Sequence, residues 1–237
     1  DADNNCLYCG KAMTAKCAGT YYTSVKDAIA AANANDTVTL LKSVAESCTI
    51  EKNMTLDLGG NNNIDSNITI KSGSTLTLAG EGIVSVVQSG TSGDGVVGGA
   101  LNVASDKVTV NLLSVQQKPT PEMNLSKGTF WKIELSDNLK DQMKANELLA
   151  KGYAFASNGS GNIVDGYVYR LDNVKVVSHT HEITTGNKCV CGYPCDHSNG
   201  FTDEGKCKDC GTQFTAGIGE TYYTDVPSAL DAAADGQ

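Results

Sequence analysis

Short runs of alternating aliphatic and polar residues dominate the middle of the chain. Thr, Asn or Asp alternates with Leu, Ile, Val or Met in six such runs, at residues 37–41, 54–58, 67–70, 75–78, 100–103 and 108–112. A period of two places the aliphatic side chains on one face of an extended strand. Clusters of Gly and Asn such as "GGNNN" separate the runs and are typical of turns. The pattern therefore predicts a mainly β protein built from short strands.

The spacing of these runs indicates how the strands are arranged. Runs that begin at residues 37, 54 and 75 recur 17 and 21 residues apart, which is the scale of one turn of a β-solenoid. Strands of a β-sandwich come about every 8–12 residues, and a sandwich is the alternative fold. We favour a right-handed parallel β-helix over residues 37–135.

Helical patterns flank the strands. We expect a capping helix within residues 20–36, where Ser24 can cap "SVKDAIAAAN". Its apolar positions form one stripe: Val25, Ala28, Ile29 and Ala32. After the strands, "LSDNLKDQMKANELLAKGYAF" predicts one or two short helices that end at Gly152. They would belong to a closing segment of helix and strand over residues 136–177.

The chain repeats part of itself. Residues 6–32 align without a gap with residues 207–233, an offset of 201, and 13 of these 27 positions are identical. A period of this length indicates a repeated domain and not a solenoid rung. Residues 212–237 are therefore interpreted as the start of a next repeat. Residues 1–19 are interpreted as the second half of a linker from a preceding repeat.

Cysteine and histidine concentrate in residues 178–211, which we interpret as a zinc-binding linker. All three histidines and five of the nine cysteines lie there. Close pairs of such residues predict two tetrahedral zinc sites. The first would use His179, His181, Cys189 and Cys191, and the second Cys195, His197, Cys207 and Cys210. Four protein ligands leave no open position, so the zinc would be structural. Disulfides are the alternative, because an extracellular protein can oxidise its thiols.

The remaining cysteines lie near the start of the chain. Cys6 and Cys9 correspond to Cys207 and Cys210, so they are expected to be half of a further zinc site. Glycine after the second cysteine of each pair permits a left-handed backbone there (Gly10, Gly192 and Gly211). Cys17 and Cys48 could form a disulfide or remain buried thiols.

Several of these segments resemble a known class of repeat. They are "TYYTSVKDAIAAANANDTVTLLKSVAESCTIEKNMTLDLGG", "GTFWKI", "NELLAKGYAF" and the Cys/His segment that ends in "CKDCG". Together they resemble the repeat unit of large surface proteins of gut-dwelling Gram-positive bacteria. The resemblance implies a pectate-lyase-like β-helix with cysteine-rich links between repeats. It also implies an extracellular location, on the bacterial surface or secreted. Some proteins of this class resemble adhesins, and others are immunoglobulin-binding superantigens.

Charge and hydropathy exclude some functions. The net charge is −9 and the pI about 4.7, and Arg170 is the single arginine. Such a surface does not suit nucleic acid, which requires a basic patch. The sequence has no apolar run of the ~18 residues that would predict insertion into a membrane.

No catalytic set is visible. The carboxylates of the strand region, Asp57, Asp65, Glu81, Asp94 and Asp106, are scattered and are expected to be solvated. The motif "GDGVVG" at 93–98 precedes a strand-like segment, so it predicts a turn and not a dinucleotide site. We expect Trp131 in the core or in end-packing, with a binding anchor as the alternative. Tyr167 and Tyr169 would alternate along a strand.

The sequence thus predicts a non-enzymatic binding module of a bacterial surface repeat protein. Its partners would be a host protein such as immunoglobulin, or a glycan, together with adjacent repeats. The sheet face around residues 54–112 and the loops at 88–99 and 115–125 would make the contact. A structural spacer and a β-helix carbohydrate-active enzyme, lyase or hydrolase, are the alternatives.

Overall fold

The computed structural model describes residues 5–6, 9–90, 97–180, 183–185 and 188–192. It also describes positions 202, 204–206, 213–218, 221–223, 226–227, 230 and 233. The chain divides into two compact units, Asp1–His179 and Thr180–Gln237, and each is considered by itself. None of the helices in these described stretches has the length and apolar character needed to cross a bilayer.

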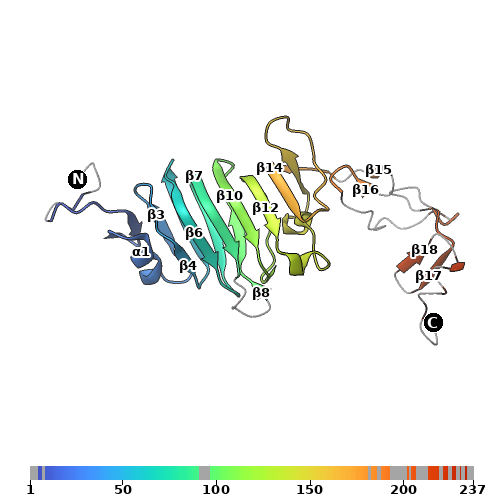
Figure 1. Ribbon diagram of the computed structural model, residues 1–237, viewed down its shortest axis with the longest axis horizontal. Coiled ribbons are helices and arrows are strands. Elements are labelled where there is room, and N and C mark those ends of the chain that lie inside the picture. The colour runs from blue at the N-terminus through green and yellow to red at the C-terminus, as the bar shows by residue number, and fades with distance from the viewer. Residues whose placement is uncertain are drawn as a thin grey trace. The chain divides into compact units, whose positions relative to one another are not determined.

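The first unit is a parallel β-solenoid of about four turns (Figure 1). One sheet contains β3 (Thr37–Leu40), β5 (Met54–Gly60), the first half of β7 (Thr75–Ser89) and β9 (Ala100–Val103). The other contains β4 (Cys48–Ile50), β6 (Ile64–Ile70), the second half of β7, β10 (Val108–Val115) and β12 (Thr129–Leu135). All of these strands pair in parallel, which confirms the solenoid over the sandwich.

The long strand β7 bends and so serves both sheets. Gly80 and Gly82 have positive φ at the bend, a conformation that side chains disfavour. A Cβ on Gly82 would lie 1.9 Å from the carbonyl oxygen of Asn62. The backbone of two neighbouring turns therefore approaches closely here, and only glycine leaves room for it.

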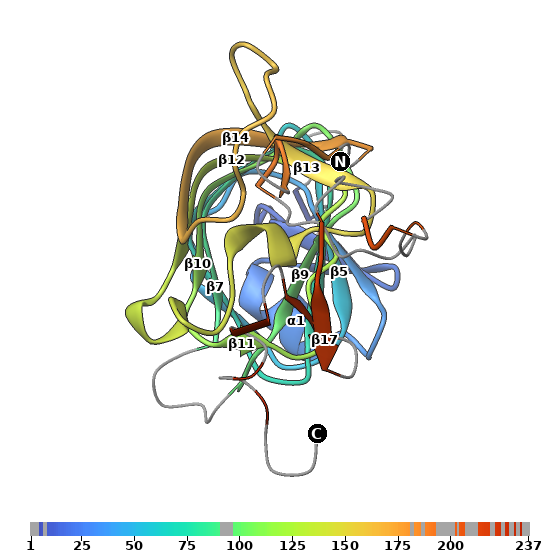
Figure 2. The same cartoon turned by 90° about the vertical axis from the view of Figure 1, so that its right-hand side faces the viewer.

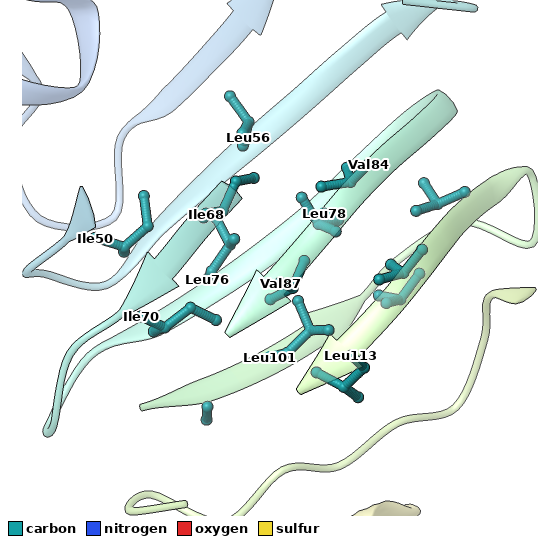
Figure 3. Packing of buried hydrophobic residues seen from close by; sticks show 14 of the residues in the cluster. Ile50, Leu56, Ile68, Ile70, Leu76, Leu78, Val84, Val87, Leu101 and Leu113 are labelled. Carbon is teal, nitrogen blue, oxygen red and sulfur yellow. The ribbon is translucent and has the colours of Figure 1, made fainter. Parts of the chain in front are cut away.

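The core is formed by side chains that stack from turn to turn (Figure 3). One ladder of paired residues is Val38, Leu56, Leu78 and Val103, and a second is Cys48, Ile68, Val87, Leu113 and Ile133. Every residue of both ladders is buried. Each buried aliphatic side chain contributes roughly 1.5–3 kcal/mol relative to its exposed state, so the repeated ladder stabilises the stack.

Turn length varies without loss of this register. Leu56 pairs with Leu78, 22 residues further on, whereas Val87 pairs with Leu113, 26 residues further on. The longer turn holds the Gly-rich insertion, after which β8 (Val97–Gly98) pairs with β11 (Lys118–Pro119). Strand β9 follows the "GDGVVG" motif, as its strand-like sequence predicted, and residues 93–96 of the motif lie outside the described residues.

A hairpin and a helix cover the first turn. Strand β1 (Ala15–Cys17) pairs with β2 (Thr20–Tyr22) and, antiparallel, with β3. Helix α1 (Val25–Ala31) begins after Ser24, whose hydroxyl accepts a hydrogen bond from the Asp27 amide at 3.4 Å. The predicted stripe Val25, Ala28, Ile29 and Ala32 is buried, which confirms it. Viewed along the stack, α1 lies within the outline of the coil (Figure 2).

A segment of helix and strand closes the opposite end. Two short 3-10 helices, η1 (Asp137–Leu139) and η2 (Ala145–Leu148), follow β12. The second ends four residues before Gly152, so the prediction that helix continues to Gly152 is wrong. Gly152 has positive φ and precedes β13 (Tyr153–Ser157). Strand β13 pairs with β14 (Arg170–Ser178), which pairs antiparallel with β12.

Two expectations about aromatic residues are wrong. Trp131 is 58% exposed, because Phe130 and Ile133 both point into the core and the two residues between them lie on the outside. Tyr167 and Tyr169 precede β14 and do not alternate along a strand. Both rings lie near the Lys144 ammonium, with centroids 5.7 and 4.1 Å away.

The second unit contains two small hairpins among its described residues. One pairs β15 (Ile183–Thr185) with β16 (Lys188–Cys189), and the other pairs β17 (Ala216–Ile218) with β18 (Thr221–Tyr223).

Candidate metal centre

A histidine and two cysteines gather in the segment from residue 179 to residue 191. The side-chain ligand atoms of His179, Cys189 and Cys191 all lie within 4.8 Å of one another. Both cysteines are buried and His179 is half-buried. Ligand atoms of a tetrahedral zinc site, with bonds of about 2.0–2.3 Å, lie roughly 3.5 Å apart. The three side chains could therefore hold a metal ion after a small contraction.

Local backbone structure positions these ligands. His179 follows the last residue of β14, and its amide donates a hydrogen bond to the Gly152 carbonyl at 2.8 Å. Cys189 ends β16 opposite Ile183. The Gly192 amide donates to the Cys189 carbonyl at 2.9 Å, and Gly192 has the predicted positive φ. This tight turn lets two ligands separated by one residue lie beside each other.

The structure brings together three of the four ligands that the sequence predicted for this site. His181 lies outside the described residues. The second predicted site, Cys195, His197, Cys207 and Cys210, lies outside them entirely, as does Gly211. The role of His181 in the first site and the whole of the second site therefore stay predictions.

Cys6 and Cys9 form a turn of a related kind. The Gly10 amide donates to the Cys6 carbonyl at 2.8 Å, and the Cys6 amide donates to the Lys11 carbonyl at 2.8 Å. Gly10 has positive φ, as expected. An isolated bridge between Asn5 and Ala12 closes the turn. The backbone therefore turns back between Cys6 and Lys11.

Cys17 and Cys48 are buried thiols and not a disulfide. Burial, and secondarily the charge of Glu46, raises the pKa of Cys48 to about 11. Burial and the nearby Asp36 also raise the pKa of Cys17. A raised pKa keeps a thiol protonated and unreactive, so these two residues act as core side chains.

Two described carboxylates of the strand region have local structural partners. Asp57 accepts a hydrogen bond from the Gly59 amide at 2.9 Å. Glu81 pairs with Lys107 at 2.8 Å. Outside the His179, Cys189 and Cys191 group, the described part of the chain has no cluster of three or more His, Cys, Asp or Glu side chains of this kind. Asp94 lies outside the described residues.

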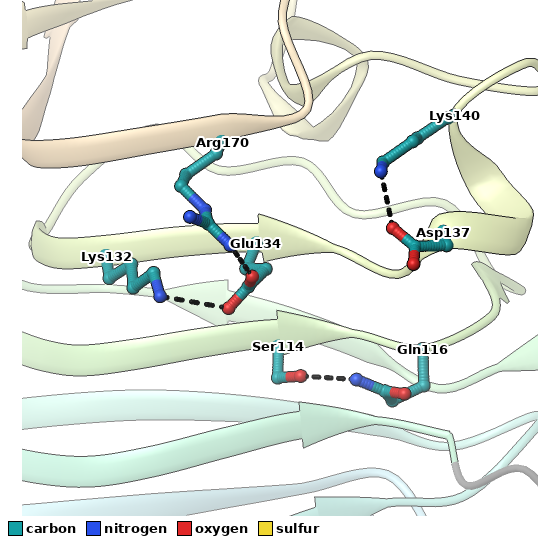
Figure 4. Close-up of polar contacts among 7 residues, drawn as sticks. All are labelled: Ser114, Gln116, Lys132, Glu134, Asp137, Lys140 and Arg170. Atoms are coloured by element: carbon teal, nitrogen blue, oxygen red, sulfur yellow. Dashed lines mark hydrogen bonds and ion pairs between the residues drawn. The ribbon is translucent and has the colours of Figure 1, made fainter.

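A group of ion pairs across β12 and β14 was not predicted from the sequence. Glu134 on β12 bonds to Arg170 on β14 and to Lys132 at 3.1 Å (Figure 4). The hydrogen bond from Arg170, and then that from Lys132, lowers the pKa of the Glu134 carboxyl. Sequence spacing gave no signal, since residues 134 and 170 meet only because β14 pairs with β12. The solitary Arg170 in an acidic chain was the available clue.

Comparisons with models of protein families, with curated proteins and with solved structures found no match for this chain.

Proposed function

We propose that this chain is a non-enzymatic module of a repeat protein on the surface of a bacterium, and that it binds a host ligand. Immunoglobulin is the first candidate for that ligand. The observation that carries the proposal is the exposed indole of Trp131 on the outside of the solenoid. A large aromatic side chain in water is costly to leave uncovered, and Trp is enriched at the energetic centres of protein interfaces.

The surroundings of Trp131 suit a protein partner. On β12 and β14, Lys132 is paired with Asp172 and Glu134 with Arg170 in the strand register. Ser114 on β10 lies opposite Glu134 in the strand register. Trp131 shares strand β12 with Lys132 and Glu134, and an apolar anchor on a strand that also carries ion-paired side chains suits an interface centre with a polar rim. We therefore extend the expected contact surface, around residues 54–112, to strand β12.

Binding accounts for the described surface better than catalysis or spacing. A β-helix hydrolase or lyase needs acid and base groups that converge on one substrate, and the Asp57 and Glu81 carboxylates instead accept bonds from Gly59 and Lys107. A spacer needs no exposed tryptophan.

We propose that the ion of the His179, Cys189 and Cys191 group is zinc, with His181 as the fourth ligand. Two thiols and imidazole nitrogen are the ligands that Zn²⁺ prefers, and a closed set of four gives a structural site. Bound zinc would hold the linker in a single conformation. The chain's own contribution is the turn at Gly192 and the bond from the His179 amide, which place the ligands in advance.

The test measures binding of the full chain to immobilised Fab fragments and intact antibodies of several classes. We expect binding of Fab that Trp131→Ala weakens at least about tenfold, as for an interface anchor. Tyr21→Ala is the matched control, because Tyr21 is also an exposed aromatic residue but lies on the capping hairpin. Antibody binding that is absent, or that is equally strong in both variants, contradicts the immunoglobulin proposal. If the chain instead bound a glycan and lost it with Trp131→Ala, the proposed binding surface would stand, and the ligand would be a glycan and not an immunoglobulin.

A further inference from the structure

The chain contains two copies of one capping hairpin. In the first copy Ala15 pairs with Tyr22 and Cys17 with Thr20. In the second copy Ala216 pairs with Tyr223 and Ile218 with Thr221, at the same offset of 201. The preceding bridges also correspond, Asn5 with Ala12 and Lys206 with Gln213. The sequence repeat is therefore a structural repeat with identical strand register.

The first copy shows what this element covers. Its strand β1 uses its second edge to pair antiparallel with β3, with Ala15 opposite Leu40 and Cys17 opposite Val38. Its helix buries an apolar stripe in which Val25 is 0% and Ile29 is 5% exposed. Hairpin and helix together therefore cover the edge and the open core of the first solenoid turn.

The same surface is uncovered in the second copy. Val226 and Leu230 correspond to Val25 and Ile29 (offset 201) and are 49% and 69% exposed. Within the described residues, the strand Ala216–Ile218 pairs with β18 alone. An apolar stripe and an open strand edge thus occur together at the positions that are buried in the first copy.

We infer that the described residues of this copy, the hairpin of β17 and β18 together with Val226 and Leu230, form a docking surface for the open end of another β-solenoid of this type. The occupant is a first turn with the sequence pattern of residues 37–50. The register of the first copy fixes the pairing: Ala216 lies opposite a residue in the place of Leu40, and Ile218 opposite one in the place of Val38. Ile218 replaces Cys17 with an equally apolar side chain, so the contact retains its buried character.

One substitution specifies the occupant further. In the sequence, Asp225 corresponds to Ser24 of the first copy, whose hydroxyl donates to Glu46 at 2.8 Å, and Asp225 itself lies outside the described residues. A glutamate in the occupant at that place would meet a second carboxylate, and like charges at short range are destabilising. The occupant therefore carries a neutral residue at the position of Glu46. The inference rests on the repeat-protein part of the proposed function and is independent of its ligand.

The experiment extends the full chain. Residues 37–180, with Glu46→Gln, are joined directly after Gln237, which preserves the spacing of the first copy because 36 + 201 = 237. We expect amide exchange in peptides covering residues 216–230 to slow at least about tenfold relative to the unextended chain, as local opening is suppressed. We expect the appended solenoid to unfold cooperatively.

Matched variants separate docking from general stability. Val226→Asp with Leu230→Asp should lower the melting temperature of the appended solenoid and leave that of the first solenoid unchanged. Val25→Asp with Ile29→Asp should do the reverse. Three outcomes would each overturn the inference. Amide exchange at 216–230 could stay unchanged, or the appended solenoid could be insensitive to the substitutions at 226 and 230. The appended solenoid could also fail to fold although the second cap is intact. Antibody binding plays no part in this readout, so its failure and that of the ligand proposal are distinguishable.

Discussion

The Ser24 hydroxyl donates a hydrogen bond to the Glu46 carboxylate, with 2.8 Å between Oγ and Oε2. Glu46 lies in the loop before β4 and also accepts the Val25 amide at 3.1 Å. At the other end of α1, the Lys52 ammonium donates to the Ala30 carbonyl at 3.3 Å. An anion at the helix N-terminus and a cation at its C-terminus both oppose the helix dipole. The cap is thus fastened to the solenoid at both ends of its helix.

Removing the first of these contacts should loosen the cap. Glu46→Ala is expected to lower the free energy of unfolding by about 1 kcal/mol, since it removes an acceptor for Ser24 and for two amides of the first helical turn. Urea denaturation provides the measurement. Glu51→Ala is the control. The Glu51 carboxylate forms an exposed ion pair with the Lys71 ammonium at 3.5 Å, and such a surface pair contributes well under ~1 kcal/mol. Equal losses in both variants would show that the contact to α1 contributes nothing specific.

The metal centre should be separable from the solenoid. We expect protein purified without added metal to contain between one and two zinc ions, as the paired ligands predict. Cys189→Ser should remove one of these ions, and Cys17→Ser should remove none, because Cys17 lies in the core of the first unit. Elemental analysis gives the metal content. A chain whose cysteines are all in disulfides and that carries no zinc would contradict the prediction.

Chelation should act on the linker alone. With zinc removed, amide exchange should accelerate in residues 183–192, because β16 and the Gly192 turn carry the ligands Cys189 and Cys191. The solenoid should keep its melting temperature, because its stacked ladders do not include these ligands. If chelation unfolded the whole chain, the metal would also stabilise the solenoid, which contradicts this prediction.

The strands were predictable because their signal is local. Each of the six alternating runs lies in a strand apart from Leu41, which follows the end of β3, and α1 begins at the residue after its predicted cap. Other features depend on distant segments. The second half of β7 was not predicted, because Gly80 and Gly82 were expected to end the strand. In the structure they form a bend within it. Trp131 was misplaced because the core-facing alternation shifts at a corner of the coil. β1 was missed within the expected linker of residues 1–19, since its pairing with β3 is not encoded locally.

The buried thiol of Cys48 should make the solenoid sensitive to alkali. Its pKa in the folded state is about 11, raised from 9.0 chiefly by burial. The unfolded chain therefore loses this proton first, and the stabilising contribution is complete below pH 9 and is lost as the pH rises through about 11. Cys48→Val should reduce the fall in stability between pH 9 and pH 11, measured by urea denaturation at each pH. A fall that is identical in both proteins would assign the alkaline sensitivity to other groups.

The bend in β7 should tolerate no side chain. Gly82→Ala would place a Cβ 1.9 Å from the Asn62 carbonyl oxygen, at a residue whose φ is +154°. The neighbouring atom is backbone within the stack, so it cannot move aside without disturbing the pairing of two turns. We expect a loss of roughly 2–4 kcal/mol in the free energy of unfolding, the range of severe single substitutions.

Gly60→Ala is the matched control on β5, because a Cβ there has no atom within 4 Å. Its stability should change by less than about 1 kcal/mol. Comparable losses at the two positions, measured by urea denaturation, would show that close approach at the bend is not what requires glycine.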